Sequence, residues 1–112
     1  MAERTRDVIW FEELSRGDVG LVGGKNASLG EMVQTLGSKG IKVPAGFATT
    51  ADAFREFITA NDLDDRIAGT MARLKARKIS LHEAGQTVRA AIVGGDFPET
   101  AREAILRSYR EL

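Results

Sequence analysis

The sequence predicts a mixed α/β fold that is rich in helix and poor in sheet. Its first half holds two or three short apolar runs, and four or five amphipathic segments follow the helical period along the chain. Val8–Phe11 is a continuous run of β-branched and aromatic residues, which predicts a short buried strand. Ile41–Val43, just before Pro44, predicts a second strand, and residues 45–49 could form a third. So little sheet suggests that further strands come from elsewhere in a larger domain.

The first helix is predicted from Asn26 to about Gly37, after a glycine-rich loop that covers residues 12–24. Ser28 and Glu31 have the spacing of a capping box near the start of this helix. Glycines in the loop allow backbone conformations that are closed to other residues, and loops of this kind often carry function. The apolar positions of the predicted helix are Leu29, Met32, Val33 and Leu36.

Start signals divide the second half of the chain into further helices. Thr50 is a suitable N-cap for a helix over residues 51–60, and Ser80 with Glu83 forms a capping box before another. A helix between them follows Asn61, and Pro98 suits the first turn of the last helix. The residues predicted to face inward are Phe54, Phe57 and Ile58; Leu63, Ile67, Met71 and Leu74; Leu81, Ala84, Val88 and Ile92; and Ala101, Ile105, Tyr109 and Leu112.

The last helix has no stop signal before Leu112. Together with the small sheet, this predicts that residues 1–112 are an incomplete domain. Uncovered apolar faces and unpaired strand edges usually find a partner, so we expect the isolated chain to self-associate or to be marginally stable.

Composition excludes several classes of function. Apolar residues make up 43% of the chain and charged residues 29%, which is typical of a globular protein. Lys plus Arg and Asp plus Glu are both 16, so there is no overall basic field to attract nucleic acid or anionic lipid. The chain has no cysteine, and the apolar run after the charged residues 1–7 is too short for a signal peptide or a membrane span. A cytoplasmic protein is expected.

One local pattern is typical of an anion-binding site. Gly23 and Gly24 are followed by Lys25 at the start of the predicted helix. The glycines let backbone N–H groups approach an oxyanion, and the helix N-terminus favours negative charge. A lysine there costs roughly 0.3–1 kcal/mol without an anion, which points to a phosphate ligand. The pattern is not a Walker A loop, because Val19 and Asn26 occupy positions that need glycine and Ser or Thr. Local pattern alone leaves open that the glycines only make a tight turn beside a solvated lysine.

Other polar residues are predicted to have ordinary structural roles. The single histidine, His82, lies in the first turn of an amphipathic helix and is expected to be an exposed side chain. Asp64 and Asp65 are adjacent on a helix and point in different directions, which argues against a metal site. Trp10 is expected to pack in a core. The sequence therefore predicts no catalytic residue and no metal ligand in this chain.

Two segments, VGGKNASLGEM at residues 22–32 and VPAGFATTADAF at residues 43–54, together resemble the N-terminal start of phosphoenolpyruvate synthases (pyruvate, water dikinases). The resemblance runs from about Val8 to the C-terminus. The two motifs in this order are typical of the dikinase group, which includes pyruvate phosphate dikinase and rifampicin phosphotransferase. A fragment of one of these relatives is an alternative, as is a stand-alone helical protein-interaction module.

The resemblance implies the first lobe of an ATP-grasp-like nucleotide-binding domain. The implied enzyme converts ATP, pyruvate and water to phosphoenolpyruvate, AMP and phosphate. Lys25 matches the family lysine that contacts ATP phosphates, Gly23 and Gly24 would allow the backbone to come close, and Mg²⁺ would accompany ATP. The family's magnesium ligands, phosphorylated histidine and pyruvate-binding barrel would all lie beyond Leu112. The isolated chain is therefore expected to be inactive.

Overall fold

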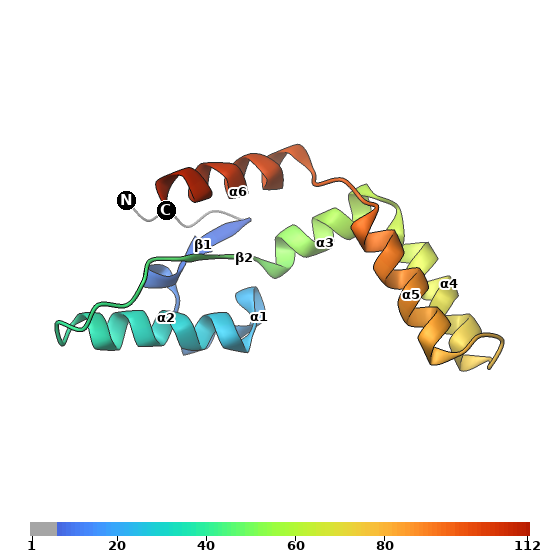
Figure 1. Ribbon diagram of the computed structural model, residues 1–112, viewed down its shortest axis with the longest axis horizontal. Helices are drawn as coiled ribbons and strands as arrows, with labels where there is room; N and C mark the ends of the chain where they lie inside the picture. The colour runs from blue at the N-terminus through green and yellow to red at the C-terminus, as the bar shows by residue number, and fades with distance from the viewer. Residues whose placement is uncertain (1–6) are drawn as a thin grey trace. The chain divides into compact units, whose positions relative to one another are not determined.

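A computed structural model describes residues 7–112, which form two compact units (Figure 1). Unit 1 comprises residues 7–54 and 99–112, and unit 2 comprises residues 55–98. The charged start at residues 1–6 lies outside the described residues. In chain order the elements are β1 (Val8–Trp10), 3₁₀ turns at Phe11–Glu13 and Arg16–Asp18, α1 (Val19–Val22), α2 (Gly24–Gly37), β2 (Phe47–Thr49), α3 (Ala51–Ala60), α4 (Leu63–Lys75), α5 (Leu81–Val93) and α6 (Glu99–Glu111).

The sheet of unit 1 is a two-stranded antiparallel ladder. Val8 of β1 lies opposite Thr49 of β2, and Trp10 lies opposite Phe47. The rings of this last pair are 5.4 Å apart at an interplanar angle of 54°, a tilted arrangement that aromatic pairs favour. Trp10 is buried, so its prediction as a core residue is confirmed. Within unit 1 the sheet lies between α2 and α6 (Figure 1), and α6 contacts β1.

The core of unit 1 joins the sheet to α1 and α2. Its buried apolar side chains are Ile9, Leu14, Val22, Ala27 and Ala48, with the partly buried Phe11 packed against them. The helix α2 comes very close to the chain after β1. A Cβ placed on Gly30 would lie 2.8 Å from the carbonyl oxygen of Leu14 and 2.9 Å from that of Phe11. Only a glycine fits at this contact.

The strand predicted at Ile41–Val43 does not form. Residues 41–46 contain no strand, because β1 pairs with Phe47–Thr49 and the apolar run Ile41–Val43 lies outside that ladder. β-Branched residues favour a strand only where a neighbouring strand accepts their backbone hydrogen bonds. The possible strand at residues 45–49 was correct for Phe47–Thr49.

The region predicted as a loop, residues 12–24, is more regular than expected. It contains two 3₁₀ turns and the single-turn helix α1. The helix α2 begins at Gly24, two residues before the predicted start, so Ser28 and Glu31 lie inside it and do not form a cap. A capping box instead occurs at Ser15, whose N–H donates to Asp18 Oδ2 at 3.0 Å.

The predicted caps of the later helices are confirmed. Ala53 N donates to Thr50 Oγ1 at 3.1 Å at the start of α3, and Glu83 N donates to Ser80 Oγ at 3.1 Å at the start of α5. Each of these bonds occupies one of the N–H groups that a helix leaves free at its start. No helix among residues 7–112 is long and apolar enough to cross a membrane.

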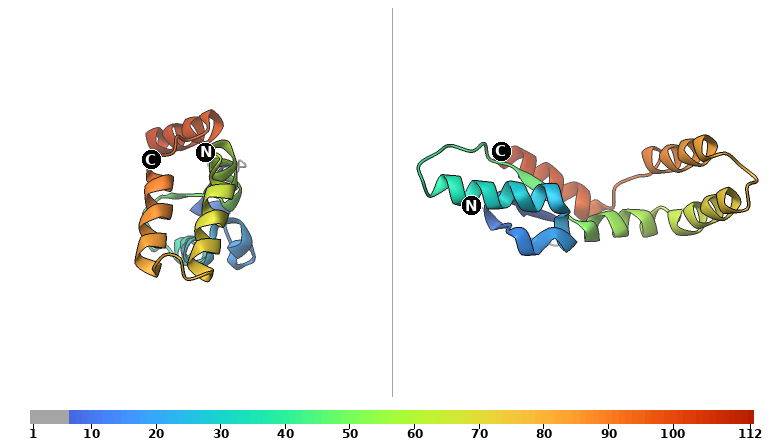
Figure 2. Two further views of the ribbon diagram at one scale, coloured as in Figure 1. Left: turned by 90° about the vertical axis from the view of Figure 1, so that its right-hand side faces the viewer. Right: turned by 90° about the horizontal axis from the view of Figure 1, so that it is seen from below.

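Unit 2 contains an antiparallel helical hairpin in which α4 and α5 lie side by side (Figure 2). Its core comprises Phe57, Ile58, Leu63 and Ala91, with Ile67 and Ile92 packed against them. The ring of Phe97 lies 5.8 Å from that of Phe57. The inward-facing predictions are confirmed for Phe57, Ile58, Leu63, Ile67 and Ile92, whereas Ala91 was not predicted. They fail for several other residues. Side chains predicted to be inward but exposed in the structure are Phe54, Met71, Leu81, Tyr109 and Leu112.

A single side chain, Asn61, ties the end of α3 to the segment after α5. Its Nδ2 donates to the carbonyl oxygens of Phe57 and Asp96, each at 2.8 Å, and its Oδ1 accepts from Asp96 N at 2.9 Å. The two bonds to Asp96 join residues that are 35 positions apart in the chain, whereas the bond to Phe57 spans four. The N–H and C=O groups of Asp96 lie outside the helices, and the Asn61 side chain supplies hydrogen-bond partners for them.

We predict that Asn61→Ala destabilises this connection by about 1 kcal/mol, because three backbone groups lose a partner while remaining partly open to water. Amide hydrogen exchange of Asp96 measures the effect directly, and it should become roughly fivefold faster. Gln86→Ala removes an exposed amide of the same unit and serves as the control. Unchanged exchange at Asp96 in the Asn61 variant would contradict this role.

Candidate functional site

Gly23 is the joint between α1 and α2. Its N–H donates to the carbonyl oxygen of Val19 at 2.8 Å and ends α1, while its own carbonyl oxygen accepts from Ala27 N at 3.1 Å and starts α2. Its dihedral angles are φ 86° and ψ 164°. This backbone region is open essentially to glycine alone. One glycine thereby ends one helix and begins the next without an intervening loop.

The N-terminus of α2 presents free N–H groups to solvent. Gly24, Lys25 and Asn26 form the first turn, and their N–H groups precede the first hydrogen bond within the helix. Gly23 is the N-cap and makes no side-chain capping hydrogen bond. Gly23, Gly24 and Lys25 are all exposed. The structure therefore gathers the three predicted site residues at one accessible helix end, where backbone dipoles favour an anion.

Asn26 supports this turn and was not singled out from the sequence. Its Nδ2 donates to the carbonyl oxygen of Val22 at 2.9 Å, so it bonds across Gly23 to the last residue of α1. The bond is partly buried and links the short helix α1 to the start of α2 on either side of the glycine. The four-residue spacing between Val22 and Asn26 could have suggested it, since asparagine commonly bonds to a nearby carbonyl group.

The rest of α2 is held in place by contacts with the chain that follows β1. Gln34 Nε2 donates to the carbonyl oxygen of Glu12 at 3.1 Å and also to that of Leu14. The close contact at Gly30 lies one turn earlier on the same helix. These contacts hold α2 against the chain after β1, so the helix N-terminus projects from a fixed support.

The remaining candidates belong to unit 2, whereas this site belongs to unit 1. His82 lies in the first turn of α5 and is exposed, as are Asp64 and Asp65 near the start of α4. In the part of the chain that the structure describes, no three His, Cys, Asp or Glu side chains come together in a way that could hold a metal ion. The chemistry available at the α2 N-terminus is therefore the binding of an anion by backbone N–H groups and one lysine.

The chain is clearly similar to proteins of a known family. The family model described as "Pyruvate phosphate dikinase, AMP/ATP-binding domain" matches residues 19–112. The chain is 50% identical over 106 residues to a phosphoenolpyruvate synthase of Neisseria meningitidis, and 44% identical over 108 residues to one of Synechocystis. It is 40% identical over 106 residues to one of Escherichia coli.

These alignments cover 94–96% of the chain but only 13% of each relative. The chain thus spans about one eighth of the length of the curated relatives that it matches. The matches do not favour the alternative of a stand-alone helical interaction module, since both motifs at residues 22–32 and 43–54 fall within the matched family region.

Proposed function

Because this chain belongs to the pyruvate phosphate dikinase AMP/ATP-binding domain family, we propose that it forms the first part of the ATP-binding domain of a phosphoenolpyruvate synthase. The three relatives with that name described above are 40–50% identical to it over nearly the whole chain. The whole enzyme would make phosphoenolpyruvate, AMP and phosphate from pyruvate, ATP and water. The present chain would contribute to ATP binding, and pyruvate would bind in domains outside it.

The proposal assigns the ATP phosphates to the N-terminus of α2. The observation that carries it is that Gly23, Gly24 and Lys25 lie exposed at a helix start that has no side-chain cap. The N–H groups of Gly24 and Lys25 would bind phosphate oxygens, and the lysine ammonium would neutralise part of their charge. In phosphoryl transfer such contacts position the phosphates and stabilise charge without covalent chemistry.

The remainder of the site would come from residues outside this chain. The ligands of the Mg²⁺ that accompanies ATP would be among those residues. The two-stranded sheet would belong to a larger ATP-grasp-like lobe. Exposed apolar side chains of unit 1, such as Val19, Met32 and Ile41, would then be covered by the rest of the domain. The isolated chain would lack pyruvate-dependent turnover and would tend to self-associate through these side chains.

We predict that Lys25→Ala in the full-length enzyme slows formation of the phosphoenzyme from ATP by about tenfold, because one charge-assisted phosphate contact is lost. The measurement is single-turnover transfer of label from ATP to protein. Thermal unfolding should be unchanged, since the Lys25 side chain is exposed and contributes nothing to the core.

Lys39→Ala is the matched control, because Lys39 is an exposed lysine just beyond the other end of α2. It removes the same charge far from the helix N-terminus and should leave the rate unchanged. Equal rates for the Lys25 variant and the wild type would refute the assignment of the phosphates to this site.

A further inference from the structure

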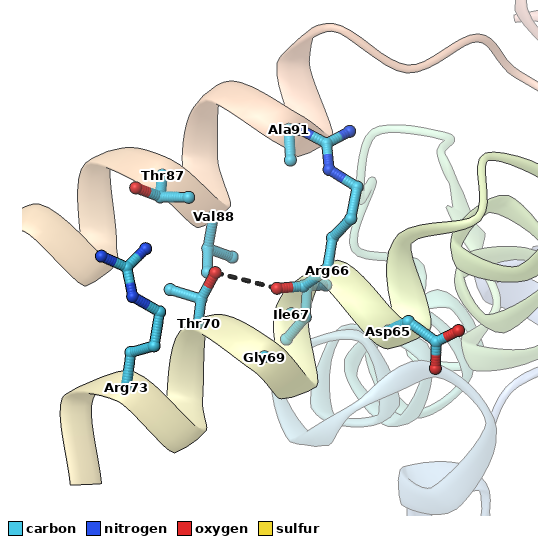
Figure 3. A pocket seen from close by; sticks show the side chains of 9 residues that line it. All are labelled: Asp65, Arg66, Ile67, Gly69, Thr70, Arg73, Thr87, Val88 and Ala91. Atoms are coloured by element: carbon cyan, nitrogen blue, oxygen red, sulfur yellow. Dashed lines mark hydrogen bonds between the residues drawn. The ribbon is translucent and has the colours of Figure 1, made fainter. Parts of the chain in front are cut away.

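A second candidate site lies in unit 2, between α4 and α5. Between the two helices lies an open pocket of about 280 Å³ that the proposed ATP site does not use (Figure 3). Its lining residues are Asp65, Arg66, Ile67, Gly69, Thr70, Arg73, Thr87, Val88 and Ala91. All of them belong to the same compact unit, so the pocket is a property of the hairpin itself.

The floor and the edges of this pocket differ in chemistry. Ile67, Val88 and Ala91 supply apolar surface where α4 meets α5. Thr70 Oγ1 donates to the carbonyl oxygen of Arg66 at 2.8 Å, so its hydrogen is already used within α4. The Thr87 hydroxyl is on the facing helix and is exposed. The interior is therefore mainly apolar, and charge is restricted to the edges.

Two arginines of α4 reach toward α5 on either side of the pocket. Arg66 extends toward Ala91 and Arg73 toward Thr87 (Figure 3). They are seven residues apart, so they lie about 10 Å apart along the helix axis and on the same face. Within residues 7–112 neither guanidinium forms an ion pair. The carboxylate of Asp65 points away from both (Figure 3).

The surrounding segment is basic although the chain as a whole is neutral. The α4–α5 hairpin, residues 63–93, contains six Lys or Arg residues and three acidic residues, Asp64, Asp65 and Glu83, whereas the whole chain has 16 of each sign. The positive potential is thus concentrated on the hairpin that carries the pocket. A local excess of one charge beside an apolar cavity attracts ligands of the opposite charge.

We propose that the α4–α5 pocket binds a small organic anion. The apolar body of the ligand lies on Ile67, Val88 and Ala91, and its phosphate or carboxylate group pairs with Arg66 or Arg73. Arginine suits this role because its planar guanidinium makes paired hydrogen bonds to either oxyanion. The pocket shares no residue with the proposed ATP site, whose phosphate contacts belong to unit 1.

The test is a titration of the isotopically labelled chain with phenyl phosphate, followed by amide NMR shifts. We expect saturable shifts at Thr70, Thr87 and Ala91 with a dissociation constant in the millimolar range. Benzoate in a parallel titration distinguishes a carboxylate ligand from a phosphate ligand. Inorganic phosphate, which has no apolar body, should bind at least about fivefold more weakly, because the floor of the pocket then contributes nothing.

Two double variants, each lacking two positive charges, distinguish binding in the pocket from attraction by the basic segment as a whole. Arg66→Gln with Arg73→Gln should weaken phenyl phosphate binding by about tenfold. Arg77→Gln with Lys78→Gln removes two charges from the segment after α4, outside the pocket lining, and should change the affinity less than about twofold. Equal losses in the two variants would overturn the proposal, as would shifts that do not saturate or that map outside the hairpin. All four substitutions replace exposed side chains, so folding should be preserved.

Discussion

Replacing Gly30 by alanine should destabilise unit 1 by about 3 kcal/mol, the largest effect expected from a single methyl group in this chain. The added Cβ would overlap Leu14 Cβ and lie within 3 Å of the carbonyl oxygens of Leu14 and Phe11. Two of these neighbours are backbone atoms, which cannot rotate away. Relief therefore requires α2 to move off the chain that follows β1, which would open the core around Leu14.

Trp10 makes this prediction measurable, because it is the only tryptophan and lies buried in unit 1. Denaturant unfolding followed by its fluorescence reports on this unit. Gly37→Ala is the matched control: it changes a glycine of the same helix, and a Cβ there would meet no atom within 4 Å. The control should be neutral or slightly stabilising, since alanine is a better helix former. A Gly30 variant as stable as this control would show that α2 does not lie so close to the chain after β1.

Replacing Gly23 by alanine should cost about 2 kcal/mol for a different reason. A Cβ at Gly23 would meet no atom within 4 Å, so there is no clash to relieve. The penalty comes from φ 86° and ψ 164°, which an L-residue other than glycine rarely adopts. To escape it, the alanine variant would have to change the direction in which α2 leaves α1. The same substitution in the full-length enzyme should therefore also reduce phosphoenzyme formation from ATP.

Gly24→Ala provides the control, because Gly24 is the neighbouring glycine, is exposed and has ordinary helical geometry. It should leave the Trp10 unfolding transition in place. Comparison with Lys25→Ala separates the two contributions, since the lysine variant should lose rate without losing stability. If Gly23→Ala and Gly24→Ala behaved alike, the joint between α1 and α2 would not depend on the positive φ of Gly23.

Local chemistry explains which features could be predicted from the sequence. Thr50 and Ser80 cap their helices through bonds to residues three positions away, so a short stretch of sequence contains the whole interaction. The N-cap of α2 was placed too late because Gly23 has no side chain to signal a cap. Ser28 and Glu31 matched the capping pattern by spacing alone. The candidate site at Gly23, Gly24 and Lys25 was proposed from the glycine–lysine pattern, but the bond from Asn26 to Val22 across the joint was not predicted.

Features that depend on distant parts of the chain were harder to predict. Ile41–Val43 has the composition of a strand, yet the only strand that β1 pairs with in residues 7–112 is Phe47–Thr49. Leu81 and Tyr109 continue the apolar period of their helices, yet they are 75% and 69% exposed. Periodicity indicates which face of a helix is apolar, but it does not show how far along that face a neighbour extends.

The contact between β1 and α6 also determines the order in which the protein can fold during synthesis. Unit 1 is built from chain on both sides of residues 55–98, so its last helix leaves the ribosome after the whole of unit 2. The α4–α5 hairpin has mostly local contacts and can form while α6 is still being made. Until then β1 lacks the cover that α6 provides. The growing chain therefore exposes part of this apolar strand until α6 has been made, and exposed apolar surface of this kind promotes aggregation.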